Sequence, residues 1–198
     1  MNNKTLVVSR YDEDTDWLLR LPSWNIIVYD KGTTNDKNYP SNRLPNVGRE
    51  AETYLNYIVN NYDKLNEYTG FVQGRPFDHL HFAHFGDWVA NIPNAVSYIN
   101  DINITQDFML FGEHPPHICD NIGSPHYTGL EFSGYAKLIN VNVPPILSYR
   151  AGAQFIVSRE KILRKSRDFY NNILKTTNKE INPRESYFLE RLWQYIFE

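Results

Sequence analysis

The segment 70–84 holds the densest group of potential metal ligands and acid–base residues in the chain. One carboxylate and three imidazoles follow a short apolar stretch and a Gly/Pro turn: Asp78, His79, His81 and His84. A strand that ends in such a turn delivers its next polar side chains to a sheet edge, where open α/β folds bind ligands. Asp78 is therefore a candidate for metal or substrate binding, although an Asp after a strand is also a common turn former.

The ligand types favour a hard cation over zinc. The spacing of the histidines matches neither a helical His-x-x-x-His pair nor a zinc finger. Asp78 with His79 better suits Mg²⁺ or Mn²⁺ bound beside phosphates, because hard cations prefer oxygen ligands. A zinc-dependent hydrolase that uses these histidines, with His114 and His117, is a further alternative.

Polar residues also follow the first two apolar stretches. Ser9, Arg10 and Tyr11 come directly after one stretch, and Asp30 follows the next. If both stretches are parallel strands, these residues meet at one sheet edge and can contact a nucleotide. The acidic run at 12–14 fits the same site, or equally a solvated helix start.

Residues at two predicted helices complete the candidate site. Asn46 and Arg49 flank a glycine at the start of a predicted helix, where free N–H groups and a guanidinium suit phosphate. An Arg49–Glu50 surface pair is the alternative. Glu190 borders the apolar stripe of the last helix, where partial burial would make it a general base. A salt bridge from Glu190 to a neighbouring arginine is equally compatible with the sequence.

These residues need a sheet to bring them together, and the apolar pattern predicts one. Strands are expected at 5–8, 25–29, 69–73, 108–111, 138–143 and 153–157, with helices between several of them. A strand–helix–strand start implies a parallel pair. The prediction is one α/β domain over 1–198, with a mixed, mostly parallel sheet flanked by helices.

The helical pattern is clear in three places. One helix starts near Arg49, one is capped by Ser158 and continues to 174, and the last follows Asn182. A broken helix is expected around Pro93, and 112–135 is expected to be irregular.

Net charge, cysteine count and the amino-terminal residues indicate which classes of protein are excluded. The net charge of −3 without a basic block argues against nucleic-acid binding, and Cys119 is the one cysteine. The amino-terminal apolar run is too short for a signal peptide or membrane span. We expect a cytoplasmic protein, in the host cytoplasm if it is viral.

Several motifs together resemble an uncharacterised glycosyltransferase-like family found in fungi, bacteria and large DNA viruses. They are Ser-Arg-Tyr-Asp-Glu-Asp (9–14), Tyr-Asp-Lys-Gly (29–32), Leu-Pro-Asn-Val-Gly-Arg-Glu-Ala-Glu-Thr-Tyr-Leu (44–55), Gln-Gly-Arg-Pro-Phe-Asp-His (73–79), Gly-Ala-Gln-Phe-Ile-Val-Ser-Arg-Glu-Lys-Ile (152–162) and Leu-Glu-Arg-Leu-Trp (189–193). The chain is also similar to the first domain of a chlorovirus glycosyltransferase that modifies the capsid protein.

This resemblance implies a GT-A fold and a metal-assisted glycosyltransferase. Its donor would be a nucleotide-diphosphate sugar, in particular a UDP-sugar, and its acceptor a glycan or glycoprotein. Only Asp78 remains of the Asp-x-Asp metal motif typical of GT-A enzymes. Glu190 would be a base for the acceptor hydroxyl, by analogy of position.

The resulting hypothesis assigns a role to each residue. The base and ribose would be held by Ser9, Arg10, Tyr11 and Asp30. The diphosphate would be positioned by Asn46, Arg49 and Arg75, and Gln73 would also contact the donor. Asp78 and His79 would hold Mn²⁺ or Mg²⁺, with the acceptor entering under 112–135 and meeting the sugar near 152–154. The rival class is a non-catalytic module that binds a nucleotide or sugar.

Overall fold

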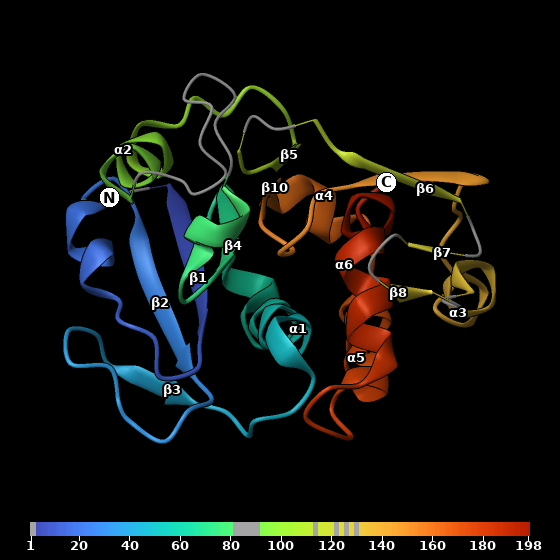
Figure 1. The fold of residues 1–198 in the computed structure, drawn as a ribbon, viewed down its shortest axis with the longest axis horizontal. Coiled ribbons are helices and arrows are strands. Elements are labelled where there is room, and N and C mark those ends of the chain that lie inside the picture. Colours follow the sequence, from blue (N-terminus) through green and yellow to red (C-terminus); the bar gives the residue numbers. More distant parts are fainter. Residues whose placement is uncertain (1–2, 81–91, 113–114, 121–122, 125–126, 129–130) are drawn as a thin grey trace.

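A computed structural model describes residues 3–80, 92–112, 115–120, 123–124, 127–128 and 131–198 (Figure 1). Within these ranges the protein is an α/β structure built on a six-stranded mixed sheet. None of the helices described is both long and apolar enough to cross a membrane.

The order of the strands brings the predicted site residues to one edge. Across the sheet the strands are β3 (Ser41–Arg43), β2 (Asn25–Asp30), β1 (Lys4–Arg10), β4 (Tyr68–Gln73), β10 (Phe155–Ser158) and β5 (Phe108–Leu110). The first four are mutually parallel, and β10 is antiparallel to both of its neighbours. The carboxyl ends of β1, β2 and β4 therefore share an edge, as the strand–helix–strand pattern predicts.

Alternating side chains on β1 give each face of the sheet its own core. Leu6 and Val8 pack toward the 3₁₀-helix η1 (Asp16–Arg20) and α2 (Ile92–Asp101). Val7 packs toward the opposite layer of α1 (Arg49–Asn61), α5 (Arg167–Thr177) and α6 (Arg184–Ile196). Figure 1 shows α1 beside α5 and α6 on that face. A strand covered on both faces is apolar throughout, which explains why 5–8 shows no polar alternation.

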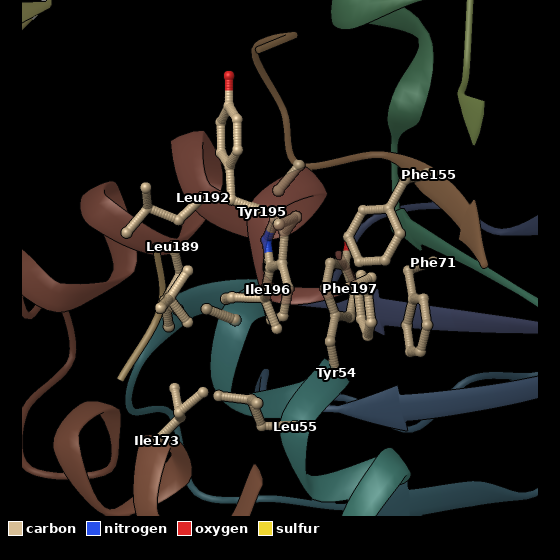
Figure 2. Packing of buried hydrophobic residues seen from close by; sticks show 14 of the residues in the cluster. Tyr54, Leu55, Phe71, Phe155, Ile173, Leu189, Leu192, Tyr195, Ile196 and Phe197 are labelled. Carbon is tan, nitrogen blue, oxygen red and sulfur yellow. The ribbon is translucent and has the colours of Figure 1, made fainter. Parts of the chain in front are cut away.

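Aromatic rings hold the α1–α6 layer onto the sheet. The ring centroids of Phe71 on β4 and Phe155 on β10 lie 5.0 Å apart, and Tyr54 of α1 lies 4.9 Å from Phe71 (Figure 2). Trp193 of α6 lies 5.2 Å from Phe155. Each such fully buried ring contributes about 1.5–3 kcal/mol of hydrophobic stabilisation. The large aromatic content thus serves this core and fixes α1 and α6 relative to the sheet edge.

A smaller unit extends from the sheet. The strands β6 (His117–Asp120) and β9 (Ile146–Tyr149) form an antiparallel ribbon, and β7 (Gly123–Ser124) pairs with β8 (Tyr127–Thr128). Helix α3 (Phe132–Leu138) lies between β8 and β9 in the chain, and its Phe132 and Tyr135 rings pack on Phe188 of α6. The expectation that 112–135 is irregular is therefore wrong for the described part of this segment.

The predicted strand at 138–143 is also wrong. Helix α3 ends there, and Asn140 adopts a left-handed φ of 57°. The N–H of Asn140 donates to the Lys137 carbonyl at 3.2 Å, and that of Val141 to the Ala136 carbonyl at 2.8 Å. These bonds close the helix end, for which Asn is a favoured residue. Val141 after it is buried, Val143 is half-buried, and the strand begins only at Ile146.

One helix prediction needs correction, and another lies partly outside the described residues. The expected helix from Ser158 to 174 is two helices, α4 (Arg159–Leu163) and α5, because Ser166 provides a second N-cap. Pro93 lies in the first turn of α2, where its missing N–H costs no hydrogen bond. Within the described residues α2 continues past Pro93 to Asp101. The preceding Trp88 and Val89 lie outside the described residues.

Gly48 is the position where the link between α1 and α5 is most sensitive to substitution. Its φ is +65°, and a Cβ there would lie 2.6 Å from both the Glu52 Cβ and the Thr177 carbonyl oxygen. We expect Gly48→Ala to lower the free energy of unfolding by more than about 2 kcal/mol, measured by urea denaturation. The matched control is Gly134→Ala in α3, where a Cβ meets no atom within 4 Å. That variant should gain about 0.5–1 kcal/mol of stability. Equal effects at both glycines would contradict the packing argument.

Candidate functional site

A cavity of about 510 Å³ lies at the carboxyl edge of β1 and β4, beside the amino-terminal end of α1. It gathers most of the predicted site residues: Ser9, Arg10, Tyr11, Asn46, Arg49, Gln73, Arg75 and Asp78. Three predicted residues, Asp30, His79 and Glu190, do not line it. The register explains the grouping, because Ser9 of β1 lies opposite Gln73 of β4 and Arg10 lies opposite Asp30 of β2.

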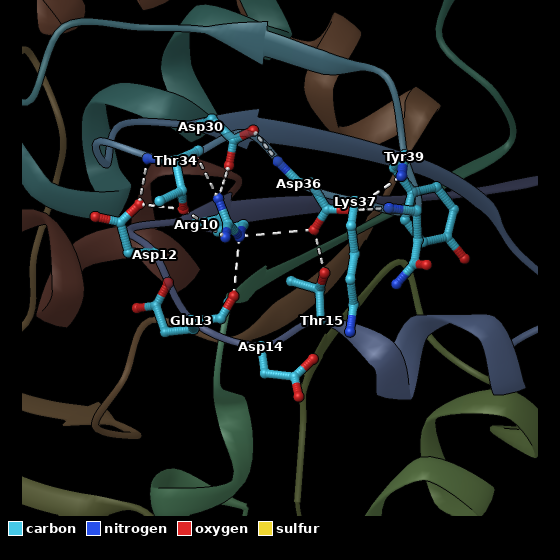
Figure 3. A network of polar contacts seen from close by, with 12 residues as sticks. Arg10, Asp12, Glu13, Asp14, Thr15, Asp30, Thr34, Asp36, Lys37 and Tyr39 are labelled. Carbon is cyan, nitrogen blue, oxygen red and sulfur yellow. Dashed lines mark hydrogen bonds and ion pairs between the residues drawn. The ribbon is translucent and has the colours of Figure 1, made fainter.

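Arg10 is the centre of a buried polar network beneath this cavity (Figure 3). Its guanidinium donates to Asp30 Oδ1 at 2.7 Å and to the backbone oxygens of Thr34 and Glu13, both at 2.9 Å. Asp30 is fully buried, and its other oxygen accepts the N–H of Asp36 at 3.1 Å. The structure therefore gives Asp30 a positioning role, in place of the expected direct contact with a nucleotide.

The loop after β2 is tied to the loop after β1 by a second carboxylate. Asp12 accepts hydrogen bonds from the backbone N–H and the hydroxyl of both Thr33 and Thr34, at 2.7–2.9 Å. The backbone and side-chain bonds from these threonines lower the pKa of Asp12 well below its usual range. A side chain at Gly32 would collide with the Asp12 carboxylate, so the loop requires glycine there. These bonds hold the first part of the long polar loop after β2 in place.

Glu13 lines the cavity and joins two of the loops around it. Its carboxylate accepts the Tyr11 N–H and lies over Gly74, where an added Cβ would approach Glu13 Oε2 to 2.6 Å. Burial raises the pKa of Glu13, although the hydrogen bonds and Arg10 oppose that change. The Gly/Pro turn after β4 thus uses its glycine to pass close to the loop that follows β1.

Lys31 fixes the entry to α1. It is buried, and its ammonium donates to the carbonyls of Val47 and Arg49 at 2.5 and 2.6 Å and pairs with Glu52 at 2.7 Å. Burial lowers the Lys31 pKa, and the Glu52 carboxylate opposes that shift. The lysine holds the loop that carries Asn46 and Arg49 against β2.

Arg49 reaches across to the start of α6. One of its guanidinium nitrogens donates to the Tyr187 hydroxyl at 3.0 Å and to the Asn182 amide oxygen at 3.3 Å. The guanidinium carbon also lies 5.0 Å from the centre of the Tyr187 ring. Arg49 and Asn182 both line the cavity, so the α5–α6 loop forms its rim. Arg49 has a φ of 51°, and such strain in a non-glycine residue is often associated with a functional position.

Asp78 faces the solvent side of the cavity. It belongs to the short helix η3 (Pro76–His79), its side chain is 60% exposed, and Arg75 Nε lies 3.9 Å from its carboxylate. The Gln154 side chain anchors this turn by donating to the Pro76 carbonyl at 3.0 Å. Asp78 is therefore held in place through its backbone, while its carboxylate is accessible to a ligand.

His79 and Glu190 meet at another turn. A Cβ on Gly152 would lie 2.7 Å from His79 Cγ, so the imidazole packs against this glycine. Glu190 accepts the Gly152 N–H on one oxygen and pairs with Arg191 on the other, both at 2.7 Å. Gly152 and Ala153 have left-handed φ values of 88° and 51°. In this arrangement Glu190 braces a strained turn, and the salt-bridge alternative for Glu190 is present.

The zinc alternative rests largely on histidines that the structure does not describe. His81, His84 and His114 lie outside the described residues, and His117 lies on β6 beside the Tyr149 ring. Within the described part of the chain, no three His, Cys, Asp or Glu residues are grouped so that they could hold a metal ion.

Five lining residues are absent from the predicted site: Glu13, Lys31, Glu50, Ile181 and Asn182. Glu13 was considered only as part of an acidic run, and Glu50 only as a surface partner of Arg49. Glu50 is instead buried, with its carboxylate 3.6 Å from Arg49 Nε. Its position directly after the Gly-Arg pair at the start of α1 was the available signal, because residues at the first helical turn lie at the same sheet edge.

The comparison with known families adds one result. The family profile described as "Protein of unknown function (DUF3431)" matches residues 6–106 and 122–198, which is most of the chain. The chain belongs to the DUF3431 family. No curated protein and no solved structure matches it. The function of this DUF3431 protein must therefore be argued from the cavity itself.

The buried network makes a testable contribution to stability. Arg10→Met leaves the Asp30 carboxylate buried without its guanidinium, and breaking such a pair typically costs about 3–5 kcal/mol. We expect a loss of that size in urea denaturation at pH 7. Lys37→Met, which removes the exposed Lys37–Asp16 pair, is the matched control and should change stability little. If the two variants lose similar stability, the network does not organise the site.

Proposed function

We propose that this protein is a glycosyltransferase of GT-A type, which transfers a sugar from a UDP-sugar to a glycan or glycoprotein acceptor. The observation that carries the proposal is the cavity at the carboxyl edge of β1 and β4. This is the position at which open α/β sheets bind ligands. The mixed sheet with helices on both faces is compatible with the GT-A fold, and that argument from fold is one of analogy.

The cavity has groups suited to each part of a nucleotide. Tyr11 is about half exposed at the end of β1, where its ring can stack on a planar base. Gln73 and Asn46 offer amide groups to a ligand. Arg49 and Arg75 supply the cationic donors that a diphosphate needs, and guanidinium–phosphate bonds are among the strongest polar contacts.

The metal hypothesis fits in a limited form. Mg²⁺ is commonly held by one or two carboxylates together with substrate phosphates, so Asp78 could hold it once a diphosphate is present. The accessible Asp78 carboxylate meets that requirement, whereas the His79 ring is packed against Gly152. Bound there, Mg²⁺ or Mn²⁺ would neutralise charge on the leaving diphosphate. We propose Asp78 as its protein ligand.

The non-catalytic alternative would use the same residues for binding. A module that binds a nucleotide or sugar needs the arginines and Tyr11 but no base. The presence of a buried carboxylate in the cavity, at Glu50, favours the enzyme over this alternative.

A thermal-shift panel tests the donor site directly. UDP at about 100 times its Kd should stabilise the protein by about 2.7 kcal/mol, whereas CMP and AMP should give less. Arg75→Ala should weaken UDP binding by roughly 10- to 100-fold, because it removes about 1.5–3 kcal/mol of charge-assisted bonding. Arg164→Ala is the control, since this arginine has a similar exposed pairing, with Glu160, and does not line the cavity. No shift with any nucleoside diphosphate at millimolar concentration would refute the proposed function.

Asp78→Asn tests the metal ligand separately. The variant keeps the shape of the side chain and removes the charge that a hard cation requires. Calorimetric Mn²⁺ binding in the presence of UDP should weaken by at least about 10-fold, while the melting temperature stays near that of the wild type, as expected for an exposed residue. Full Mn²⁺ affinity in Asp78→Asn would show that Asp78 is only a turn residue.

A further inference from the structure

The proposed function needs a group that removes a proton from the acceptor, and we propose that Glu50 is this base. The inference rests on the proposed function and names a residue for which the sequence suggested no catalytic part. It starts from the position of Glu50, which lies in the first turn of α1 and lines the cavity together with Gln73 and Asp78.

The other carboxylates of the cavity have different environments. Glu13 accepts the Tyr11 N–H and closes the contact between two loops. Asp78 is largely exposed beside Arg75. Glu50 is only 8% exposed, yet it lines the cavity. A carboxylate of this kind can be reached by a bound hydroxyl and is shielded from bulk water, as a general base requires.

The charged groups around Glu50 come from three elements. Arg49 of α1 lies 3.6 Å away, Lys31 approaches from the end of β2, and Glu190 faces it from α6. Burial raises the pKa of Glu50, Arg49 opposes that shift, and Glu190 adds to it. The neighbouring Tyr54 hydroxyl has its pKa raised well above the usual value by the same burial and by both carboxylates. Glu50 is thus more basic than an exposed glutamate.

Glu190, the base expected by analogy, already has partners for its carboxylate. Both of its carboxylate oxygens are bonded, one to the Gly152 N–H and the other to Arg191. It does not line the cavity. Its negative charge instead acts on Glu50. Glu190 is therefore a positioning residue in this scheme.

The reaction step balances with Glu50 as the acceptor of one proton. The acceptor O–H gives its proton to a Glu50 carboxylate oxygen while that hydroxyl oxygen forms a bond to the anomeric carbon. The bond from the anomeric carbon to the phosphate oxygen breaks, and the nucleoside diphosphate leaves with the electron pair beside Arg49 and Arg75. Glu50 then releases the proton to solvent. Attack assisted by a base on the face opposite the leaving group inverts the anomeric configuration.

The test uses water as the acceptor, so that no natural acceptor need be known. The wild type is incubated with UDP-glucose, UDP-galactose and UDP-N-acetylglucosamine, and the released sugar is read by proton NMR before mutarotation. Glu50→Gln should reduce kcat for hydrolysis at least about 100-fold. The Kd for UDP should change less than about 3-fold, and the released sugar should be the β-anomer from these α-linked donors. Glu160→Gln, an exposed carboxylate on α4 outside the cavity, is the control.

The pH profile provides a second readout. A base must be ionised, so kcat should fall as the pH drops through the pKa of Glu50. Glu190→Gln keeps an oxygen for the Gly152 N–H but removes a negative neighbour, so this acid limb should move to lower pH. An unmoved limb would overturn the assignment.

Folding of the variant can be checked without activity. Because burial makes ionised Glu50 unfavourable, Glu50→Gln should melt at a higher temperature than the wild type at pH 7. The difference should shrink as the pH falls and Glu50 becomes protonated. A lower melting temperature at pH 7 would assign Glu50 to structure and overturn its role as the base.

The outcomes separate the inference from the proposed function. Hydrolysis retained in Glu50→Gln, release of the α-anomer, or lost UDP affinity with unchanged kcat would each overturn the inference. UDP binding without hydrolysis of any of the three donors by the wild type would also overturn it and would favour the non-catalytic alternative. Absence of nucleotide binding by the wild type would instead refute the proposed function.

Discussion

The Arg10–Asp30 ion pair is the interaction on which the arrangement of the site depends. It joins the ends of β1 and β2 where the two strands leave the sheet, and it directs both following loops. The same guanidinium binds backbone oxygens in each loop, at Glu13 and Thr34. A buried pair of this kind is not an efficient source of stability, because desolvation opposes the attraction. Its effect here is geometric, since it fixes the position of one wall of the cavity.

Two turns near the cavity depend on left-handed glycines, which allow two segments of the chain to approach closely. At Gly48 a left-handed residue lets the start of α1 lie against the end of α5. At Gly152 another lets the chain pass over the His79 ring, with Glu190 holding its N–H. The residues that follow these glycines, Arg49 and Ala153, are also left-handed, and such strain in a non-glycine residue, about 1–3 kcal/mol, persists only where neighbours enforce it. The aromatic core between α1, α6 and the sheet provides that support.

The sequence predicts the central sheet well because its strands are short apolar runs bounded by turn residues. It predicts the grouping of Ser9, Arg10 and Gln73 for the same reason, since parallel strands bring their carboxyl ends together. Prediction from the sequence fails where tertiary contacts determine whether a segment is a strand, a turn or buried. The residues at 138–143 are as apolar as a strand, and only the helix end at Asn140 shows that they form a turn. Likewise, the start of α1 places Glu50 at the sheet edge, but its burial depends on tertiary packing that no local pattern shows.

The charges at the cavity limit how a diphosphate could bind there. Lys31 is occupied by Glu52 and two carbonyls, and Arg10 by Asp30, so neither cation is offered to a ligand. Arg49 and Arg75 are the lining cations that remain accessible in the described cavity, against the carboxylates of Glu13, Glu50 and Asp78. Two cations cannot balance a diphosphate and three carboxylates. Binding would therefore require a divalent cation, a protonated carboxyl group, or both. Burial raises the pKa of Glu13, so Glu13 is the carboxyl group expected to take up a proton on donor binding, while Glu50 stays ionised as the proposed base.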